Sequence, residues 1–206
     1  MIFEFRTYLL KPGTAPKVEE LFGEMIANRA NLSRIAGFWR TEVGTLNTII
    51  HIWPYKDLNE RDQVRAEAVR TGVWPPKSSD YILEMESKIV HAAPFSPHFE
   101  PGEHGGLYEF RTYTYGPGSI PKVIEAWSSR IQARSAISPL IFAGYTDIGA
   151  LNQWIHVWAY KNMGERETLR AKALSAGVWP PPRHESVVLH KQTSTFAIPA
   201  KWSPLR

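Results

Sequence analysis

The sequence predicts an α+β fold in which two ferredoxin-like βαββαβ repeats pack their antiparallel sheets face to face as one intramolecular α/β barrel. Three observations carry this prediction: a tandem duplication, the order of strand and helix patterns in each copy, and an aromatic sheet face that needs cover. The duplication is read from paired segments: Ile2-Phe-Glu-Phe-Arg-Thr-Tyr8 returns as Leu107-Tyr-Glu-Phe-Arg-Thr-Tyr113, and Gly72-Val-Trp-Pro-Pro76 returns as Gly177-Val-Trp-Pro-Pro181.

The two copies stand 105 positions apart, as Arg6 and Arg111 do. They align without a gap from Ile2 to about Ala92, with roughly a third of the positions identical. Each copy has the length of a small domain. We therefore expect a first repeat over residues 1–99, a linker over 100–106 and a second repeat over 107–206, related by an approximate two-fold axis.

The first copy opens with a strand, a helix and a hairpin. Alternating β-rich residues predict a strand from Ile2 to Leu10, and the turn residues Lys11-Pro-Gly13 follow it. Apolar residues then recur at helical spacing, so we expect a helix capped by Thr14 that runs to about Asn31. A second strand is expected from about Gly37 to Val43, joined by a short link to a third strand that ends near Tyr55.

A second helix and a fourth strand complete the copy. Asp57 is placed to cap a helix through about Arg70, and Gly72 is placed to terminate it. The fourth strand is expected near Tyr81 to Val90. The resulting order of strand, helix, strand, strand, helix, strand is that of the split βαβ unit.

The alternation divides each sheet into two faces. Phe3, Phe5, Ile50 and Ile52 suit the side that the helices cover, which leaves large aromatic and charged side chains on the opposite face. That aromatic area is too large to leave in water, and the second copy supplies a matching face to cover it. The residues expected to face the barrel interior are Glu4, Arg6, Tyr8, His51, Trp53 and Tyr55, with Arg40 and Glu42 beside them, and Glu109, Arg111, Tyr113, Trp154, His156, Trp158 and Tyr160.

Composition excludes several classes of protein. Of the 206 residues 43% are hydrophobic, and the net charge of +4 shows no Lys/Arg cluster, which argues against disorder and against a nucleic-acid track. The third strand also lacks the glycine and the flanking basic residue of RNA-recognition modules. The chain has no cysteine, so disulfides and thiolate chemistry are excluded. Strand character begins at Ile2 and no apolar run reaches membrane-spanning length, so we expect a cytoplasmic protein.

The repeated motifs resemble the NIPSNAP family. The resemblance rests on the Tyr/Phe-Glu-Phe-Arg-Thr-Tyr opening, the Pro-Gly turn, the Gly-x-Leu-Asn-x-x-x-His-x-Trp-x-Tyr third strand, the Arg-rich second helix and the Pro-Phe-Ser-Pro tail at 94–97. It implies the dimeric α/β-barrel superfamily, which includes cofactor-free monooxygenases, isomerases, dehydratases and haem-dependent enzymes built around a barrel cavity. The second copy departs from the pattern: Ala200-Lys-Trp202 replaces the tail, and Ala143-Gly-Tyr145 stands where the first copy has Phe38-Trp-Arg40.

Two histidines and two arginines are the candidate catalytic residues. His51 and His156 recur in both copies, and an imidazole in the barrel interior can act as a base or as a ligand near neutral pH. Arg6 and Arg111 can stabilise a developing oxyanion. The structural alternatives are hydrogen-bonded core histidines and a buried salt-bridge network in which each arginine pairs with a neighbouring glutamate.

Other side chains of the same face are candidates for substrate binding, although aromatic residues there can equally form core. Positions that differ between the copies are the candidates for specificity. The predicted binding residues are Glu4, Tyr8, Arg40, Glu42, Trp53, Tyr55, Glu109, Tyr113, Tyr145, Asp147, Trp158 and Tyr160. The arginines of the second helices are more typical of a solvated face than of an anion site. No metal is expected, because the histidines and glutamates of the linker match no motif of defined geometry.

These residues indicate a protein that binds or transforms a small organic molecule in the barrel cavity without an organic cofactor, through acid–base chemistry of the oxygenase or isomerase kind. A haem-binding barrel and a non-catalytic interaction scaffold are the alternatives. We expect a small-molecule ligand, no nucleic acid and no membrane span. The outer helices and edge strands are the surfaces through which copies of the chain could form a homo-oligomer.

Overall fold

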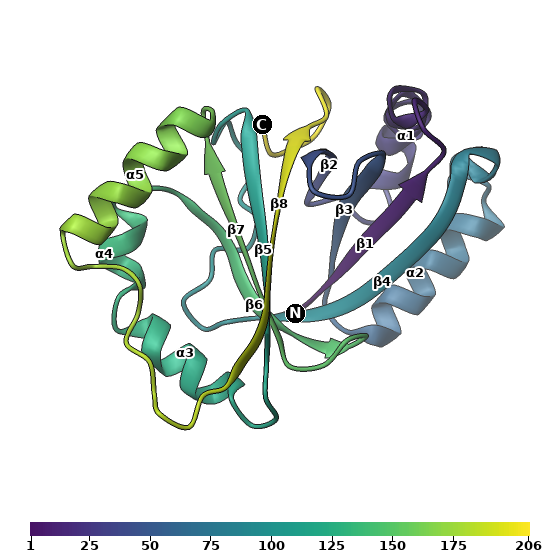
Figure 1. Cartoon of the computed structure of the whole chain (residues 1–206). Coiled ribbons are helices and arrows are strands. Elements are labelled where there is room, and N and C mark those ends of the chain that lie inside the picture. The colour runs from purple at the N-terminus through teal and green to yellow at the C-terminus, as the bar shows by residue number, and fades with distance from the viewer.

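Eight antiparallel strands close into a single barrel in the computed structural model, which describes all 206 residues (Figure 1). The strands are β1 (Ile2–Leu10), β2 (Gly37–Val43), β3 (Thr48–Tyr55), β4 (Ile82–Ala92), β5 (Leu107–Tyr115), β6 (Leu140–Ile148), β7 (Gln153–Tyr160) and β8 (Leu189–Pro199). The helices are α1 (Ala15–Ala30), α2 (Leu58–Arg70), α3 (Ile120–Ser128), α4 (Ile131–Ser135) and α5 (Met163–Ser175), with a short 3₁₀ helix at Ser79–Tyr81.

Each half of the chain contributes four adjacent strands to the barrel. Around the barrel the order is β1-β3-β2-β8-β5-β7-β6-β4, so the two seams between the halves are the antiparallel pairs β2–β8 and β4–β6. Helices α1 and α2 lie outside one half, and α3, α4 and α5 lie outside the other (Figure 1). The predicted fold, two ferredoxin-like repeats closed into an intramolecular barrel, is confirmed.

The elements of the first half begin and end close to the expected residues. The last strand of that half continues slightly beyond its predicted end, to Ala92. Thr14 precedes α1, but its hydroxyl donates to the backbone of the preceding turn at 2.7 Å and does not cap the helix. Asp57 does cap α2, because its carboxylate accepts a hydrogen bond from the Glu60 amide at 2.9 Å. Gly72 follows α2 with a φ of +70°, the left-handed conformation that favours glycine.

The second half differs from the first in one helix and one connection. The first half has a single 16-residue helix, α1, where the second half has the separate helices α3 and α4. In the sheet Arg6 lies opposite Ser87 and Arg111 lies opposite Ser194, so the last strands of the two copies are 107 positions apart. The predicted alignment without a gap is therefore wrong. The connection that leads into β8 is two residues longer than the one that leads into β4.

Both halves end in equivalent tails, so the expectation that the second copy lacks one is also wrong. At the spacing of 107 residues, Trp202-Ser-Pro204 corresponds to Phe95-Ser-Pro97. The serine of each tail accepts a hydrogen bond from a strand of the other half: Ser203 from the Phe38 amide at 3.1 Å, and Ser96 from the Ala143 amide at 2.8 Å. Each tail therefore crosses to the opposite half and fixes the start of its second strand.

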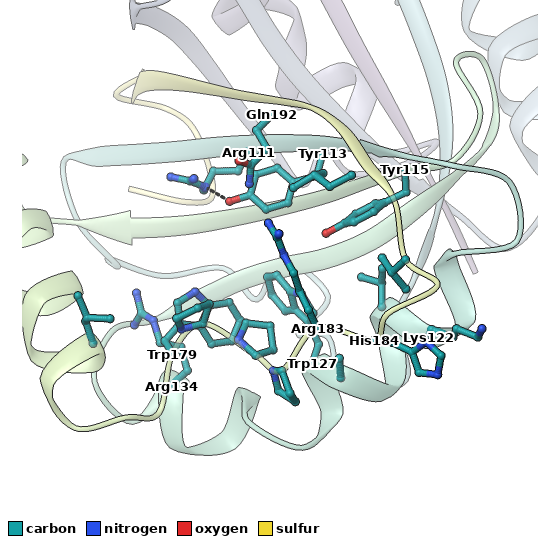
Figure 2. A pocket seen from close by; sticks show the side chains of 18 of the residues that line it. Arg111, Tyr113, Tyr115, Lys122, Trp127, Arg134, Trp179, Arg183, His184 and Gln192 are labelled. Atoms are coloured by element: carbon teal, nitrogen blue, oxygen red, sulfur yellow. Dashed lines mark hydrogen bonds between the residues drawn. The ribbon is translucent and has the colours of Figure 1, made fainter.

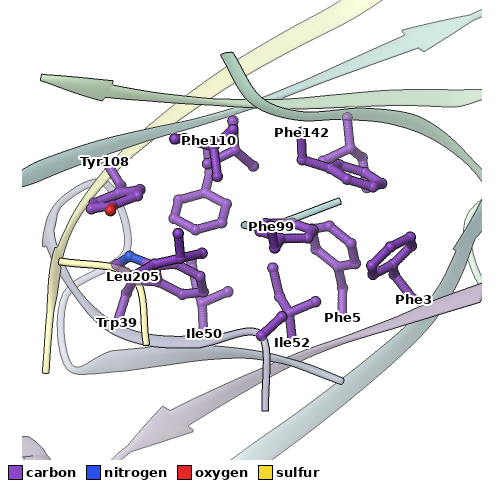
Figure 3. Packing of buried hydrophobic residues seen from close by; sticks show 14 of the residues in the cluster. Phe3, Phe5, Trp39, Ile50, Ile52, Phe99, Tyr108, Phe110, Phe142 and Leu205 are labelled. Atoms are coloured by element: carbon purple, nitrogen blue, oxygen red, sulfur yellow. The ribbon is translucent and has the colours of Figure 1, made fainter. Parts of the chain in front are cut away.

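The barrel interior is a packed apolar core (Figure 3). Phe3 and Phe5 of β1 pack against Phe142 of β6 with ring centroids 5.1 and 5.4 Å apart. The buried members of this core are Phe3, Phe5, Ala36, Trp39, Ile50, Ile52, Val90, Phe99, Tyr108, Phe110, Ile141, Phe142, Ile155, Val157, Ala159, Ala197 and Leu205. A pocket of about 160 Å³, lined largely by threonines, remains where β1, β2 and β3 meet β5 and β8.

Unequal second strands fill the interior in a complementary way. The Trp39 ring covers Gly37 and the Phe142 ring covers Gly144, and a side chain at either glycine would collide with the ring above it. At the spacing of 105 residues, Gly37 corresponds to Phe142 and Trp39 corresponds to Gly144, so the large residue and the glycine have exchanged positions between the two copies. The expected difference between Phe38-Trp-Arg40 and Ala143-Gly-Tyr145 has its physical basis here, as two ways of filling one core.

The face assignment made from the sequence is wrong, because the aromatic and charged face lies against the helices and not in the barrel. The residues expected inside but found in the layer between sheet and helices are Glu4, Arg6, Tyr8, Arg40, His51, Trp53, Tyr55, Glu109, Arg111, Tyr113, Tyr145, Trp154, His156, Trp158 and Tyr160, while Glu42 and Asp147 are exposed. The helices supply what this face needs: Phe22 and Trp127 cover its aromatic rings, and arginines of α2 and α5 neutralise its glutamates. The barrel interior takes the other face, which carries apolar side chains and a few threonines but no carboxylate.

Candidate functional site

A buried carboxylate organises the helix-facing layer of each half. Glu4 is fully buried and accepts hydrogen bonds from Arg6 and Arg61 at 2.7 Å and from Ser87 at 2.8 Å. Burial alone would raise the pKa of Glu4, but the hydrogen bond from Arg61 and the charge of Arg6 outweigh it and hold the pKa at about 2. The buried ion-pair network that the sequence offers as the structural alternative is present in this half.

The second half repeats this network around Glu109. Arg111 donates to the Glu109 carboxylate at 2.6 Å, Arg166 of α5 at 2.8 Å and Ser194 of β8 at 2.8 Å. The pKa of Glu109 is likewise held at about 2, because these donors outweigh the effect of burial. Arg61 and Arg166 therefore point inward, contrary to the expectation that the arginines of the second helices form a solvated face.

The two repeated histidines are enclosed by aromatic rings and held neutral. His51 is 1% exposed and His156 is 2% exposed, and burial lowers the pKa of His51 to about 3 and that of His156 well below its ordinary value. In each ring Nδ1 accepts a hydrogen bond of 2.7 Å from an indole, that of Trp53 or Trp158. This geometry is that of the hydrogen-bonded core histidine. The catalytic role stays a prediction, and it requires the imidazole to release its indole partner first.

The largest of the three principal pockets lies in the second half, between the outer face of β5, helices α3 and α5, and the connection leading into β8 (Figure 2). Its volume is about 500 Å³, within the range of pockets that hold small organic ligands. None of the three principal pockets of the molecule lies at the matching place in the first half. One lining side chain is smaller than its counterpart, since Ala126 stands where the first half has Leu21.

Arg111 and Tyr113 form the sheet side of the pocket. The Arg111 Nε–H donates to the Tyr113 phenol oxygen at 2.8 Å (Figure 2). Another nitrogen of the same guanidinium donates to Glu109. Because the phenol oxygen already accepts a hydrogen bond, the phenol O–H is left to donate toward the pocket. Behind it, the Tyr113 ring packs edge-to-face on His156 with the ring centroids 4.9 Å apart.

Aromatic rings form the helix side of the pocket. Trp127 of α3 and Trp179 of the connection meet edge-to-face with ring centroids 4.7 Å apart, and Tyr115 lies at the end of β5. Burial raises the pKa of Tyr115 to about 12, so this phenol stays neutral. Such walls suit a flat, conjugated ligand.

Positive charge surrounds the pocket. Arg111, Lys122, Arg134, Arg170 and Arg183 all line it, and no aspartate or glutamate does. The Arg134 guanidinium lies over the Trp158 ring at 4.4 Å from the centroid, and its hydrogen bond to the Ser138 hydroxyl fixes it there. The pocket therefore has an electrostatic preference for a ligand of opposite sign.

Of the residues predicted from the sequence, Arg111 and Tyr113 line this pocket. Arg6 and Tyr8 repeat this geometry in the first half, where the Arg6 Nε–H donates to the Tyr8 phenol oxygen at 2.6 Å. The proposed specificity residues lie elsewhere. Arg40 pairs with Glu19 of α1 at 3.3 Å, Asp147 pairs with His91 at 3.3 Å, and Tyr145 stacks on His91. The remaining predicted residues that do not line the pocket are Glu4, Glu42, His51, Trp53, Tyr55, Glu109, His156, Trp158 and Tyr160.

Sequence reasoning missed Trp127, Trp179 and Arg183. Trp179 belongs to the repeated Gly-Val-Trp-Pro-Pro motif, which in the sequence marks the duplication and gives no sign of a pocket. Arg183 belongs to the longer connection before β8. The match of Trp202-Ser-Pro204 with the tail of the first copy is the sequence signal that this connection is longer, because it sets the spacing at 107 residues. Among other features of the chain, no group of three or more His, Asp or Glu side chains is placed to hold a metal ion. No helix has the length and apolar character needed to cross a membrane.

Comparison with known proteins gives the family. The NIPSNAP family model matches residues 3–97 and 108–204, once for each half, and the second match begins 105 and ends 107 positions after the first, as the longer connection requires. The chain is 28% identical to Protein NipSnap homolog 3B of Mus musculus over 212 residues (99% of this chain and 85% of the relative). It is also 28% identical to Protein NipSnap homolog of Dictyostelium discoideum over 182 residues (86% of this chain and 78% of the relative).

A solved structure extends the likeness in fold to the whole barrel. A Lactobacillus acidophilus protein provisionally described as a monooxygenase superposes with a TM-score of 0.65 over 97% of this chain and 94% of its own, at 9% sequence identity. This likeness concerns the fold alone. The matched repeats, the barrel they form and the relatives that span nearly the whole chain lead to one conclusion: the chain is a member of the NIPSNAP family.

Proposed function

We propose that the second half binds a small organic molecule in the pocket between sheet and helices, and that Arg111 and Tyr113 act on it by acid–base chemistry without an organic cofactor. The observation that carries the proposal is a pocket of about 500 Å³ with Trp127 and Trp179 on one side and the Arg111–Tyr113 pair on the other. The site differs from the one expected from the sequence, since the barrel interior is filled by core side chains.

The Arg111–Tyr113 pair suits the stabilisation of a ligand oxygen that gains negative charge. Arg111 donates to the phenol oxygen, which makes the phenol O–H a better donor toward a carbonyl or enolate oxygen in the pocket. Glu109 holds the guanidinium in place, so little reorganisation is needed when charge develops. The pair would stabilise the enolate that a conjugated carbonyl compound forms when it gives up its α-proton to water in the pocket, and reprotonation of that enolate at another carbon would complete an isomerisation. His156, packed against both Tyr113 and Trp127, positions them from behind.

Quenching of tryptophan fluorescence tests whether the pocket binds a ligand. Anilinonaphthalene sulfonate and the uncharged phenylnaphthylamine, two fluorescent probes with the same aromatic frame, are titrated into the full chain. We expect at least one to bind at one site per chain and to quench Trp127 and Trp179. Ala171→Trp narrows the pocket mouth and should weaken binding about tenfold or more.

Ala66→Trp is the matched control, because Ala66 is the exposed counterpart of Ala171 on α2 and lies outside the pocket. It should leave binding within about twofold of the parent protein. The proposal is wrong if neither probe binds at a single site, or if the two tryptophan variants behave alike. That result would favour the non-catalytic scaffold.

Haem binding is less well supported by the residues present. A haem-ligating histidine needs an available ring nitrogen facing a cavity. In His51 and His156 Nδ1 accepts the indole hydrogen bond, so Nε2 carries the ring proton and has no lone pair for iron, and neither ring lines a principal pocket. Haem titration followed at the Soret band tests this alternative, and a stoichiometric band lost in the His51→Asn/His156→Asn double variant would support it.

A further inference from the structure

We infer that the ligand of the second half is an aromatic or conjugated oxyacid, and that Arg183, with Arg170 and Lys122, binds its acidic group. The inference rests on the proposed function of the pocket and names the class of molecule it takes. It starts from a difference between the two halves: two cations of the second half lack the ion pairs that their counterparts form in the first half, and the longer connection adds a third cation.

Lys122 is the first of these cations. Its counterpart Lys17 pairs with Glu20 at 2.6 Å on α1. Glu125 stands at the matching position on α3, yet the Lys122 ammonium forms no ion pair with it and bonds the Ser186 hydroxyl of the connection instead. The lysine is thereby held at the pocket with its charge uncompensated.

Arg170 is the second. Its counterpart on α2, Arg65, pairs with the buried Glu4 at 3.6 Å. In the second half Glu109 is bonded by Arg111 and Arg166, and Arg170 forms no ion pair or hydrogen bond within the chain. It lines the pocket half-buried, with its charge available to a ligand.

Arg183 is the third, and only the longer connection supplies it. The side chain extends from the connection toward Tyr113, across the space between the helices and the sheet (Figure 2). No ion pair or hydrogen bond within the chain holds it there. The shorter connection of the first half, residues 77–81, contains a single cation, the exposed Lys77, and forms a 3₁₀ helix.

Three free cations at one pocket select for an anion. A guanidinium presents a planar fork of N–H donors that matches a carboxylate or a related oxyanion, and an ammonium adds a third donor. A neutral ligand would displace water from these groups and leave them unpaired, which costs free energy. The flanking rings of Trp127 and Trp179 favour a flat, conjugated body attached to that acidic group.

The same two probes test the inference, since they differ by one sulfonate. We expect the sulfonate to bind about tenfold or more tightly than phenylnaphthylamine, which corresponds to one charge-assisted hydrogen bond. Arg183→Met and Arg170→Met should each weaken sulfonate binding about tenfold while phenylnaphthylamine stays within about twofold. Lys77→Met removes one charge from the matching connection of the first half and should change neither affinity.

The outcomes separate the inference from the proposed function. If phenylnaphthylamine binds in the pocket as tightly as the sulfonate, the pocket stands and the inference is wrong. The inference is also wrong if the arginine variants weaken both probes equally, because the arginines then do not bind the sulfonate group. It is wrong as well if Lys77→Met weakens sulfonate binding as much as Arg183→Met does, because the sulfonate then responds to the net charge of the protein and not to a bound oxyanion. If neither probe enters the pocket, the proposed function itself fails. Circular dichroism and melting temperature confirm that each variant is folded.

Discussion

At the scale of single residues, the helix-facing layer contains ionisable groups whose charge is fixed by their surroundings. His51 and His156 are kept neutral by burial, and their Nδ1 atoms accept indole hydrogen bonds that a protonated imidazole could not accept. Glu4 and Glu109 are kept charged by arginines in spite of burial. The folded state therefore requires neutral histidines and ionised glutamates, and both requirements fail as the pH falls.

The histidines should make the protein less stable in mild acid. Their folded pKa values lie below the ordinary 6.5, so the unfolded chain binds more protons and stability is lost as pH falls below about 6.5. Between pH 7.5 and pH 5.5 we expect each to contribute a loss of about 1.4 kcal/mol in the free energy of unfolding, measured by urea titration. In the His51→Asn/His156→Asn variant, where an amide oxygen can accept the indole bond, this loss should shrink by about 2.7 kcal/mol. An unchanged pH dependence would show that the histidines are not buried in neutral form.

The choice of face for these residues could not be predicted from alternation alone. Both faces of β3 are apolar enough to be buried, since Ile50 and Ile52 alternate with His51 and Trp53, and every one of these residues is in fact buried. What decides the face is whether counter-charges can reach it. A buried glutamate needs a positively charged partner, and here Arg61 and Arg166 supply it from helices that are distant in sequence. The glutamates can therefore be assigned to the helix side only after these arginines are known to point inward.

At the scale of elements, the two copies differ mainly in how strands are connected and helices divided. The strands, the first-half helices and the hairpins follow from local patterns, and each was predicted within a few residues. The longer connection before β8 and the pocket beside it depend on a two-residue difference that the repeated motifs conceal. The two-residue difference becomes visible when Ser87 is matched with Ser194, because each donates a hydrogen bond to the buried glutamate of its half. That match depends on contacts in the folded chain, which the local sequence pattern does not show.

The crossed tails provide a prediction at this scale. Ser203 is 1% exposed and its hydroxyl is the partner of the Phe38 amide, whereas Ser96 makes the equivalent bond to Ala143 at a partly buried position. Removing the hydroxyl from Ser203 leaves the Phe38 amide buried without a hydrogen-bond acceptor, and water cannot reach this position to take the place of the hydroxyl. We expect Ser203→Ala to cost about 1–3 kcal/mol in the free energy of unfolding and Ser96→Ala to cost less. Equal costs near zero in urea titrations would mean that the tails do not hold the seams.

At the scale of the whole molecule, the two halves share the apolar core of the barrel interior, while each half also packs a buried layer between its own sheet and helices. Phe99, which follows the first tail, stacks on Phe142 of the second half with ring centroids 4.7 Å apart, and Trp39 of the first half packs on Tyr108 and Phe110 of the second at 5.4 and 5.2 Å (Figure 3). Opening either seam, β2–β8 or β4–β6, would expose this core on both sides. The duplication therefore yields a barrel core to which both repeats contribute, in addition to the layer under the helices of each repeat.

A shared core predicts that the chain unfolds as one cooperative unit in spite of its repeated sequence. In calorimetry we expect a single transition whose van't Hoff enthalpy equals the calorimetric enthalpy. Phe142→Ala removes a second-half ring that packs on Phe3 and Phe99 of the first half, and by the usual cost of about 3–5 kcal/mol for such a truncation it should lower the midpoint by roughly 10 °C. The single transition should move as a whole, because strands from both halves lose the same support. Two resolved transitions, with only the second-half transition shifted by Phe142→Ala, would show instead that each repeat has a core that survives without the other.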